Sequence, residues 1–404
     1  MTPLIEYFQK GASKDSRALG VEIEHFVLNE TTGKPMPYDE IAQLLEFLEP
    51  IYDKAYYEEG RLIALESKTT LITLEPGCQL ELSFRYTPSL DQIRDWYEEA
   101  MEPIFAFVNE RGYRIAYSGG LPTIPVADVP RILKKRYELM EKWFETTGTR
   151  GREMMKGTAA VHVSIDYGDE ADFVKKYAMA NYLHLMLSFL TSNTPMYEGK
   201  PNADVFLRDS IWEHTDSRRS GYMPKALDAD FGFAAYANWV EQMPLVVMND
   251  GVRITDAGQR TCMQVAETYG WNETVIAHYL SMVFPFVRLK RFIEIRSADC
   301  MPLAWTLSYC ALIKGLFYDK DNVVFYSGKA SACTIDTLHA YKRCIERDQW
   351  DAKVYGDTLA GALGTLLERA ARGLDAKERA YLTRFERLVA ERRHIFEESG
   401  ENDG

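Results

Sequence analysis

The chain lacks several of the signatures that assign a function directly. Its six cysteines form no CxxC pair, which excludes a zinc knuckle, and we expect them to be reduced. No apolar run reaches the roughly 20 residues of a membrane span, and residues 1–16 contain no apolar core of signal-peptide length. A GxxxxGK(S/T) phosphate loop and a GxSxG elbow are absent as well. These absences predict a cytoplasmic protein with no membrane partner.

Acidic residues outnumber basic ones, 60 to 47, for a formal net charge of −13 over 404 residues. Such a charge repels polyanions, so nucleic acid is not expected as a partner. A single nucleotide remains compatible, because a few arginines and a bound metal ion create a local positive site. The composition does not shift along the chain. We therefore expect one domain over residues 1–396 and a disordered tail over 397–404.

Hydrophobic periodicity predicts helices interspersed with strands. Apolar residues at helical spacing predict five helices, over residues 90–110, 129–146, 169–191, 358–371 and 376–397. Alternation of apolar and polar residues predicts four strands, over residues 19–28, 70–84, 158–166 and 288–296. The regular alternation of strand and helix that marks a Rossmann fold is missing. The pattern favours an α+β protein built on an antiparallel or mixed sheet.

Each predicted strand places polar side chains on one face. Glu22 and Glu24 are two residues apart, so both project from the same side of a strand. The same spacing recurs in Gln79 with Glu81, His162 with Ser164, and Glu294 with Arg296. One such pair fits a solvated sheet face, but repeated glutamates favour a cation site, because clustered carboxylates repel one another. Oxygen-rich ligands suit Mg2+ or Mn2+; two or three ions are predicted at Glu22, Glu24, Glu75, Glu81, His162 and Glu294.

Two basic segments accompany the glutamates. The first runs from Arg208 to Gly221 and includes Arg218, Arg219 and Trp212. Its composition fits equally well a surface salt-bridge cluster or a site for carboxylate or phosphate groups. The second comprises the cations around Glu294, namely Arg288, Lys290, Arg291 and Arg296. Cations interleaved with a metal-type carboxylate suit a transferring phosphoryl group.

Six motifs, in consistent order over residues 20–300, resemble one known family. They are GVEIEH at Gly20, ITLEPGCQLELS at Ile72, KRYELM at Lys135, MMKGTAAVHVSID at Met154, RDSIWEHTDSRRSG at Arg208 and FPFVRLKRFIEIRSAD at Phe284. Together they resemble the glutamate–cysteine ligases of the plant and proteobacterial type, with the related ligase of ergothioneine synthesis. The resemblance implies an α+β fold shared with glutamine synthetase and guanidino kinases, a curved, mainly antiparallel bowl with helices outside.

The resemblance also implies an ATP-dependent reaction with a division of roles. ATP would phosphorylate the side-chain carboxylate of glutamate, and the amine of cysteine would then displace phosphate. Magnesium would bridge the ATP phosphates at the predicted metal ligands. The implied catalytic residues are Arg296, Arg288 and Lys290. The implied substrate-binding residues are Arg208, Trp212, Arg219, Gln79 and Thr215.

Three positions depart from the family pattern near the site. His162 stands where glutamine is frequent, Ser164 where asparagine is usual, and Cys78 where glycine is usual. These departures leave a different amine acceptor, or a similar acid as donor, as the nearest alternative. A phosphotransferase with a stable phosphorylated product is a second alternative, and a degenerate binding protein a third. The expected partners are small-molecule substrates, and the expected assembly is a monomer or a homodimer.

Overall fold

A nine-stranded antiparallel sheet lies at the centre of the computed structural model, which describes residues 2–13, 17–58, 60–132, 134–249 and 254–398. The strand order is β14-β15-β7-β1-β5-β4-β3-β2, and β6 also pairs with β1. The strands are β1 (Leu19–Asn29), β2 (Lys54–Glu58), β3 (Arg61–Glu66), β4 (Thr70–Leu74), β5 (Leu80–Thr87), β6 (Tyr113–Ala116), β7 (Ala160–Ile165), β14 (Val287–Leu289) and β15 (Ile293–Asp299). The sheet is open, with β14 and β2 at its two edges.

Short strand pairs lie outside this sheet. They are β8 (Met196–Tyr197) with β9 (Lys200–Pro201), β10 (Ser220–Gly221) with β13 (Phe284–Pro285), β11 (Val247–Asn249) with β12 (Ile254–Asp256), and β16 (Lys353–Val354) with β17 (Asp357–Thr358). The β10–β13 pair is parallel. It ties the chain after Arg219 to the chain before Arg288, and so links the two basic segments of the sequence.

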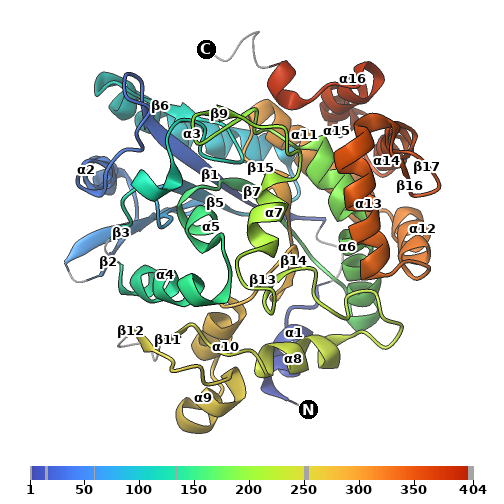
Figure 1. Ribbon diagram of the computed structural model, residues 1–404, viewed down its shortest axis with the longest axis horizontal. Coiled ribbons are helices and arrows are strands. Elements are labelled where there is room, and N and C mark those ends of the chain that lie inside the picture. Colours follow the sequence, from blue (N-terminus) through green and yellow to red (C-terminus); the bar gives the residue numbers. More distant parts are fainter. Residues whose placement is uncertain (1, 14–16, 59, 133, 250–253, 399–404) are drawn as a thin grey trace.

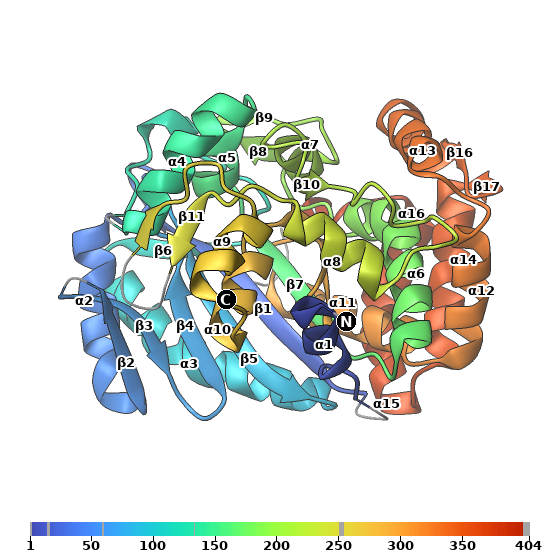
Figure 2. The same ribbon diagram turned by 90° about the horizontal axis from the view of Figure 1, so that it is seen from below.

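The helices surround the sheet (Figures 1 and 2). They are α1 (Pro3–Gln9), α2 (Tyr38–Leu48), α3 (Leu90–Glu110), α4 (Lys135–Thr147), α5 (Gly151–Lys156), α6 (Glu170–Leu190), α7 (Leu207–Glu213), α8 (Phe233–Glu241), α9 (Cys262–Tyr269), α10 (Glu273–Leu280), α11 (Leu303–Phe317), α12 (Lys320–Ala330), α13 (Ile335–Asp348), α14 (Leu359–Arg372), α15 (Ala376–Arg379) and α16 (Thr383–Glu391). Helices α2 and α3 pack on one part of the sheet, and α6 and α11 on β15 and β7. The carboxy-terminal helices α12 to α16 gather on one side of the molecule (Figure 1).

The structure contains a hairpin in each of two segments for which the sequence predicted a single strand. Residues 70–84 form β4 and β5, joined by a turn at Glu75 to Gln79. Pro76 cannot donate to a sheet ladder, and Cys78 adopts a left-handed φ of 66°, so the strand cannot continue. Residues 288–296 likewise fold into β14 and β15, which places Arg288 opposite Glu294. The prediction of one long strand in each segment is therefore wrong.

The predicted helices match the structure closely, with one late start. Helix α3 has the predicted bounds, and α6 begins after Asp169, whose side chain accepts a hydrogen bond from the Asp172 amide. Helix α4 begins at Lys135, six residues later than predicted; Val129, before Pro130, is extended, and so is Lys134 at the N-cap, with ψ of 131°. The predicted final helix is divided between α15 and α16, with a 3-10 turn between them.

The prediction of an α+β protein with an antiparallel sheet is confirmed, while its description as a curved bowl stays a prediction. A hydrophobic core cluster extends from Leu4 to Ile395. Single-domain organisation remains a prediction. Glu397 ends a 3-10 turn, and residues 399–404 of the predicted tail lie outside the described residues. Among the helices described, none has the length and apolar character needed to cross a membrane.

Candidate active site

A pocket of about 490 Å³ opens on the sheet face that carries Glu22 and Glu24. Its floor is formed by β1, β4, β5, β7 and β15, and its walls by α4, α5, α7 and the β11–β12 hairpin. Larger cavities of about 620 and 690 Å³ lie beside α15 and α12, but they lack a comparable group of partly buried glutamates. Most of the site residues predicted from the sequence line the smaller pocket.

The strand register brings the predicted carboxylates together. Glu24 lies opposite Glu81 across the β1–β5 ladder, and Thr73 of β4 lies opposite Glu81 on its other side. One step along β1, Glu22 lies between Ser83 and His162. Because side chains alternate along a strand, both rows face the pocket. The sheet thus forms two polar rows on one floor, as the two-residue spacing predicted.

The carboxylates near Glu24 lack direct counter-ions. Among the residues described, none of Glu24, Glu75 and Glu81 has a cation within ion-pair distance, although Glu81 accepts hydrogen bonds from Thr73 at 2.9 Å and Ser83 at 3.3 Å. Burial and the neighbouring Glu75 raise the pKa of Glu24 to about 8. Burial also raises the pKa of Glu75, and burial with three neighbouring carboxylates raises the pKa of Glu81 well above its usual value. We refer to Glu24, Glu75 and Glu81 as the uncompensated carboxylates.

Glu22 and His162 form the second row. Burial opposes ionisation of Glu22, but a hydrogen bond from His162 and the charge of Lys290 lower its pKa below the usual value. His162 Nδ1 lies 3.4 Å from Glu22 Oε2. Burial and the nearby Arg296 lower the pKa of His162 to about 4, so its imidazole is neutral at pH 7.

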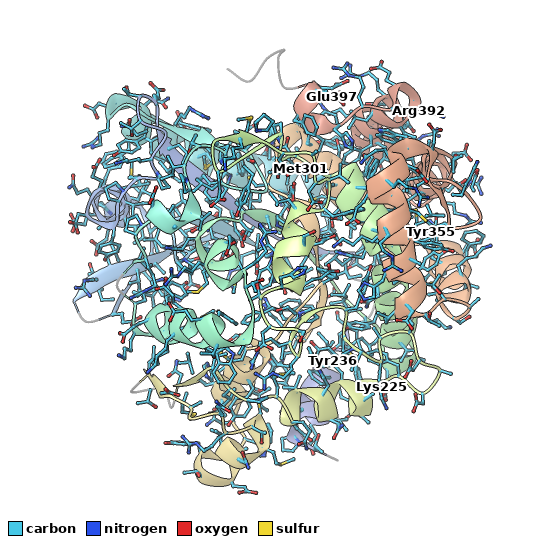
Figure 3. The ribbon with its side chains drawn as sticks, viewed as in Figure 1. Lys225, Tyr236, Met301, Tyr355, Arg392 and Glu397 are labelled. Atoms are coloured by element: carbon cyan, nitrogen blue, oxygen red, sulfur yellow. The ribbon has the colours of Figure 1, made fainter. Side chains whose placement is uncertain are left out.

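Glu294 lies in the opposite kind of environment. Its carboxylate, which is fully buried, accepts hydrogen bonds from Arg288 Nε at 2.5 Å, Lys290 Nζ at 2.8 Å and Arg296 Nη1 at 3.3 Å. These three cations overcome the effect of burial and hold the pKa of Glu294 well below its usual value. Tyr236 of α8 helps to hold β14 in place, because its hydroxyl accepts a hydrogen bond from the Leu289 amide at 3.0 Å (Figure 3 labels Tyr236). We refer to Glu294, Arg288, Lys290 and Arg296 as the three-cation cluster.

Helix α7 supplies the wall opposite the glutamates. Arg208 Nη1 donates to Ala298 O at 2.9 Å and Nη2 to Arg296 O at 3.2 Å, so β15 holds the guanidinium. The buried Nε of Arg208 has no partner among the described residues. One helical turn later, Trp212 lies under the Arg296 guanidinium, 5.3 Å from the ring centroid. A cationic donor and an aromatic wall thus face the pocket together.

Several predicted site residues do not line the pocket. Arg219 is fully buried and donates to Asp216, Met282 O and Pro244 O. The Thr215 hydroxyl donates to Ile211 O, one turn back. Lys290 and Glu294 lie behind the lining in the three-cation cluster, and Gln79 reaches the lining with its amide already bonded to Gly77, Met155 and Thr158. The substrate contacts predicted for Arg219 and Thr215 find no support in these positions.

The structure adds lining residues that sequence reasoning missed. Lys134, Arg136 and Tyr137 lie at the start of α4, where Lys134 Nζ and the Tyr137 hydroxyl both donate to Leu74 O, at 3.1 and 3.2 Å. The two cations act against the effect of burial on the pKa of Glu75. Further lining comes from Met140, Met154, Met155, Ser281 and Phe284. The basic run Lys134 to Arg136 was the available signal, but the predicted helix start at residue 129 placed it in mid-helix.

The pocket was tested for its fit to divalent cations. Within the described parts of the chain, no three His, Cys, Asp or Glu side chains converge closely enough to hold an ion alone. Mg2+ is usually held by one or two carboxylates together with water and substrate phosphates. The uncompensated carboxylates supply that donor set, since all three line the pocket and none forms an ion pair among the described residues. The donor set therefore fits the ion, provided that substrate oxygens complete the coordination.

The fold and pocket have the equipment of enzymes that transfer phosphoryl groups with divalent metal ions: buried carboxylates facing fixed arginines. Residues 18–392 match the model of Glutamate-cysteine ligase family 2, so the chain belongs to that family. The resemblance noted in the sequence motifs is thereby confirmed.

Curated relatives include plant enzymes. The chain is 32% identical over 332 residues to the chloroplastic glutamate–cysteine ligase of Arabidopsis thaliana, covering 79% of this chain and 63% of that protein. It is 30% identical over 351 residues to glutamate–cysteine ligase A, chloroplastic, of Oryza sativa subsp. indica, covering 85% and 71%. The chain thus spans slightly less than two thirds of the Arabidopsis protein.

A solved structure shows the same fold. Glutamate–cysteine ligase from Francisella tularensis, solved in complex with AMP, superposes with a TM-score of 0.53 at 12% identity, covering 96% of this chain and 85% of that one. At this identity the likeness concerns the fold alone.

Proposed function

We propose that this chain is an ATP-dependent ligase that forms γ-glutamylcysteine from glutamate and cysteine through a γ-glutamyl phosphate. The carrying observation is one pocket, in a member of this family, that faces uncompensated carboxylates toward Arg208, Arg288 and Arg296. We also propose that the open sheet is the bowl shared with glutamine synthetase. The cytoplasmic location and the choice between monomer and homodimer stay predictions.

The pocket divides the reaction among its residues. The unpartnered Arg208 Nε supports a role in binding a carboxylate of glutamate, beside the Trp212 wall. Arg288 and Arg296 would stabilise the transferring phosphoryl group. A side-chain carboxylate oxygen of glutamate forms a bond to the γ-phosphorus while the bond to ADP breaks. The cysteine nitrogen then attacks the acyl carbon, phosphate leaves, and the ammonium loses its proton.

The proposed metal ligands are Glu22, Glu24, Glu75, Glu81, His162 and Glu294. Bound Mg2+ or Mn2+ would neutralise phosphate charge and make ADP a better leaving group. An ion at Glu294 would compete with the three cations that already bind this carboxylate. We therefore assign the stronger metal affinity to the uncompensated carboxylates.

Release of ADP and phosphate tests the proposal. Turnover should require ATP, Mg2+, glutamate and cysteine together, and mass spectrometry should detect γ-glutamylcysteine. ADP release that ignores amino acids would contradict ligation, and a phosphorylated product without an amide would identify a phosphotransferase. The departures at Cys78, His162 and Ser164 make a screen of all amino acids as acceptors part of the same experiment.

A further inference from the structure

Two aromatic rings extend the pocket floor beyond its last carboxylates. Tyr86, at the end of β5, is 43% exposed, and its ring centroid lies 5.6 Å from that of Phe292, with the planes at 60°. A Cβ atom on Gly20 would lie 3.0 to 3.3 Å from three atoms of the Tyr86 ring. A side chain at position 20 would crowd the ring, so glycine favours its close approach to β1. We call Tyr86 and Phe292 the aromatic platform.

The strand register places the platform in line with the site. Gly20 pairs with Ser164, and Glu22 pairs with His162, so Gly20 lies one side-chain step beyond Glu22 on the same face. Two residues of a strand span about 7 Å. The face therefore runs from the uncompensated carboxylates, through Glu22 and His162, to the platform.

The opposite direction along the face is already occupied. Arg208, Trp212 and the start of α4 line the pocket together with Glu24. For a nucleotide whose terminal phosphate lies near Glu22 and Arg288, the direction past Gly20 leads away from these side chains. Lys290 lies on this route, with its Nζ bonded to Glu294 at 2.8 Å and 5.3 Å from the Phe292 ring centroid. Cationic charge for phosphates and a flat apolar surface thus follow one another.

We propose that the aromatic platform seats the purine base of ATP, with the triphosphate running over Gly20 toward Arg288. This inference rests on the proposed function and names the nucleotide end of that same site. Exposure supports a binding role, because a ring that only packed against β1 would be covered by the protein. Base–aromatic stacking strengthens binding by roughly 5- to 150-fold for each base.

The experiment separates base binding from phosphate binding. Titration calorimetry measures the Kd of a non-hydrolysable ATP analogue and of tripolyphosphate, both with Mg2+, for the full chain. Tyr86→Ala and Phe292→Ala should each weaken the analogue by roughly 5- to 150-fold and leave tripolyphosphate unchanged. Tyr57→Ala is the matched control, since Tyr57 is 56% exposed on the remote edge strand β2. That variant should bind both ligands as the wild type does.

Tyr86→Trp provides a second readout that does not depend on loss of a side chain. It should retain analogue affinity, and its fluorescence should change with the analogue but not with tripolyphosphate. Equal weakening of both ligands in the alanine variants, or no weakening, would overturn the platform while leaving ligation intact. Absence of binding of either ligand to the wild type would overturn the proposed function as well.

Discussion

The uncompensated carboxylates and the three-cation cluster share one sheet face but handle buried charge in opposite ways. Glu24, Glu75 and Glu81 have raised pKa values because they are buried near one another without direct counter-ions. Glu294 is buried even more completely, yet its pKa is lowered by three bound cations. The carboxylate of Glu294 is paired with cations of the protein itself, while for the uncompensated carboxylates we propose a cation from solution.

The difference shows that burial alone does not decide what a carboxylate does. A buried charge is costly unless it is paired, and the available responses are protonation, an ion pair or a metal. The three-cation cluster uses ion pairs and so presents Arg288 and Arg296 in fixed positions. The uncompensated carboxylates have raised pKa values and no ion pair among the described residues, and we propose that a divalent ion neutralises them on binding.

The largest expected change in stability follows from a substitution in the three-cation cluster. Glu294→Gln should lower the free energy of unfolding by about 3–5 kcal/mol, because it leaves three clustered cations without their buried partner. Urea denaturation measures this change. Lys54→Gln, at an exposed ion pair with Glu66, is the control and should cost less than about 1 kcal/mol. Equal losses of stability in the two variants would contradict the idea that the buried cluster at Glu294 is worth more than the exposed Lys54–Glu66 ion pair.

The same chemical change among the uncompensated carboxylates should behave differently. Glu81→Gln should alter the metal-free free energy of unfolding by less than about 1 kcal/mol, since Glu81 has no ion pair to lose and burial near three carboxylates already raises its pKa well above the usual value. The loss should instead appear in the added stability from Mg2+, which is about 2.7 kcal/mol at one hundred times the Kd. Thermal unfolding with EDTA and with Mg2+ separates the two terms. A variant that kept the full Mg2+ effect would remove Glu81 from the metal site.

Sequence reasoning captured the part of this comparison that depends on local periodicity. The two-residue spacing of Glu22 and Glu24 was enough to place both on one face, because strand side chains alternate. The three-cation cluster depends instead on the β14–β15 turn, which makes Arg288 and Glu294 cross-strand partners. Periodicity within one segment does not reveal such a turn.

The wall of the pocket opposite the glutamates was also only partly predictable from local sequence. Arg208 and Arg219 are close in sequence, yet β15 carbonyls hold the first at the pocket while Asp216 and loop carbonyls retain the second inside the protein. Lys134 and Arg136 reach the pocket from the start of α4, where they donate to the carbonyls of Leu74 and Ser281. These outcomes depend on contacts between segments that are distant along the chain.

The pH dependence of stability should distinguish the two groups with a smaller effect. The folded pKa of Glu24 is about 8, above that of the unfolded chain, so the folded state binds more protons and stability falls as pH rises toward 8. His25 and His162, with pKa values of about 4, act in the opposite direction, mainly below about pH 6.5. Burial and neighbouring carboxylates also raise the pKa of Glu81, so Glu81 acts in the same direction as Glu24 above pH 6.5, and only a variant of Glu24 identifies the share of that residue.

In metal-free buffer, the wild type should lose on the order of 1 kcal/mol or more across this interval, and Glu24→Gln should make the curve less steep. Urea unfolding at several pH values gives both curves. Saturating Mg2+ should also flatten the wild-type curve, because the ion replaces the proton. A variant with the wild-type slope would assign the titration to another group.

The smallest expected effect concerns the turn that carries Glu75. Cys78 adopts φ 66°, which costs a non-glycine residue about 1 kcal/mol, but its buried thiol recovers a similar amount through packing. Cys78→Gly should therefore change the free energy of unfolding by less than about 1 kcal/mol and leave the Mg2+ effect intact, as thermal unfolding would show. Loss of the Mg2+ effect would mean that this side chain, beyond the backbone turn, fixes the position of Glu75. The uncompensated group would then depend on packing as closely as the three-cation cluster depends on ion pairs.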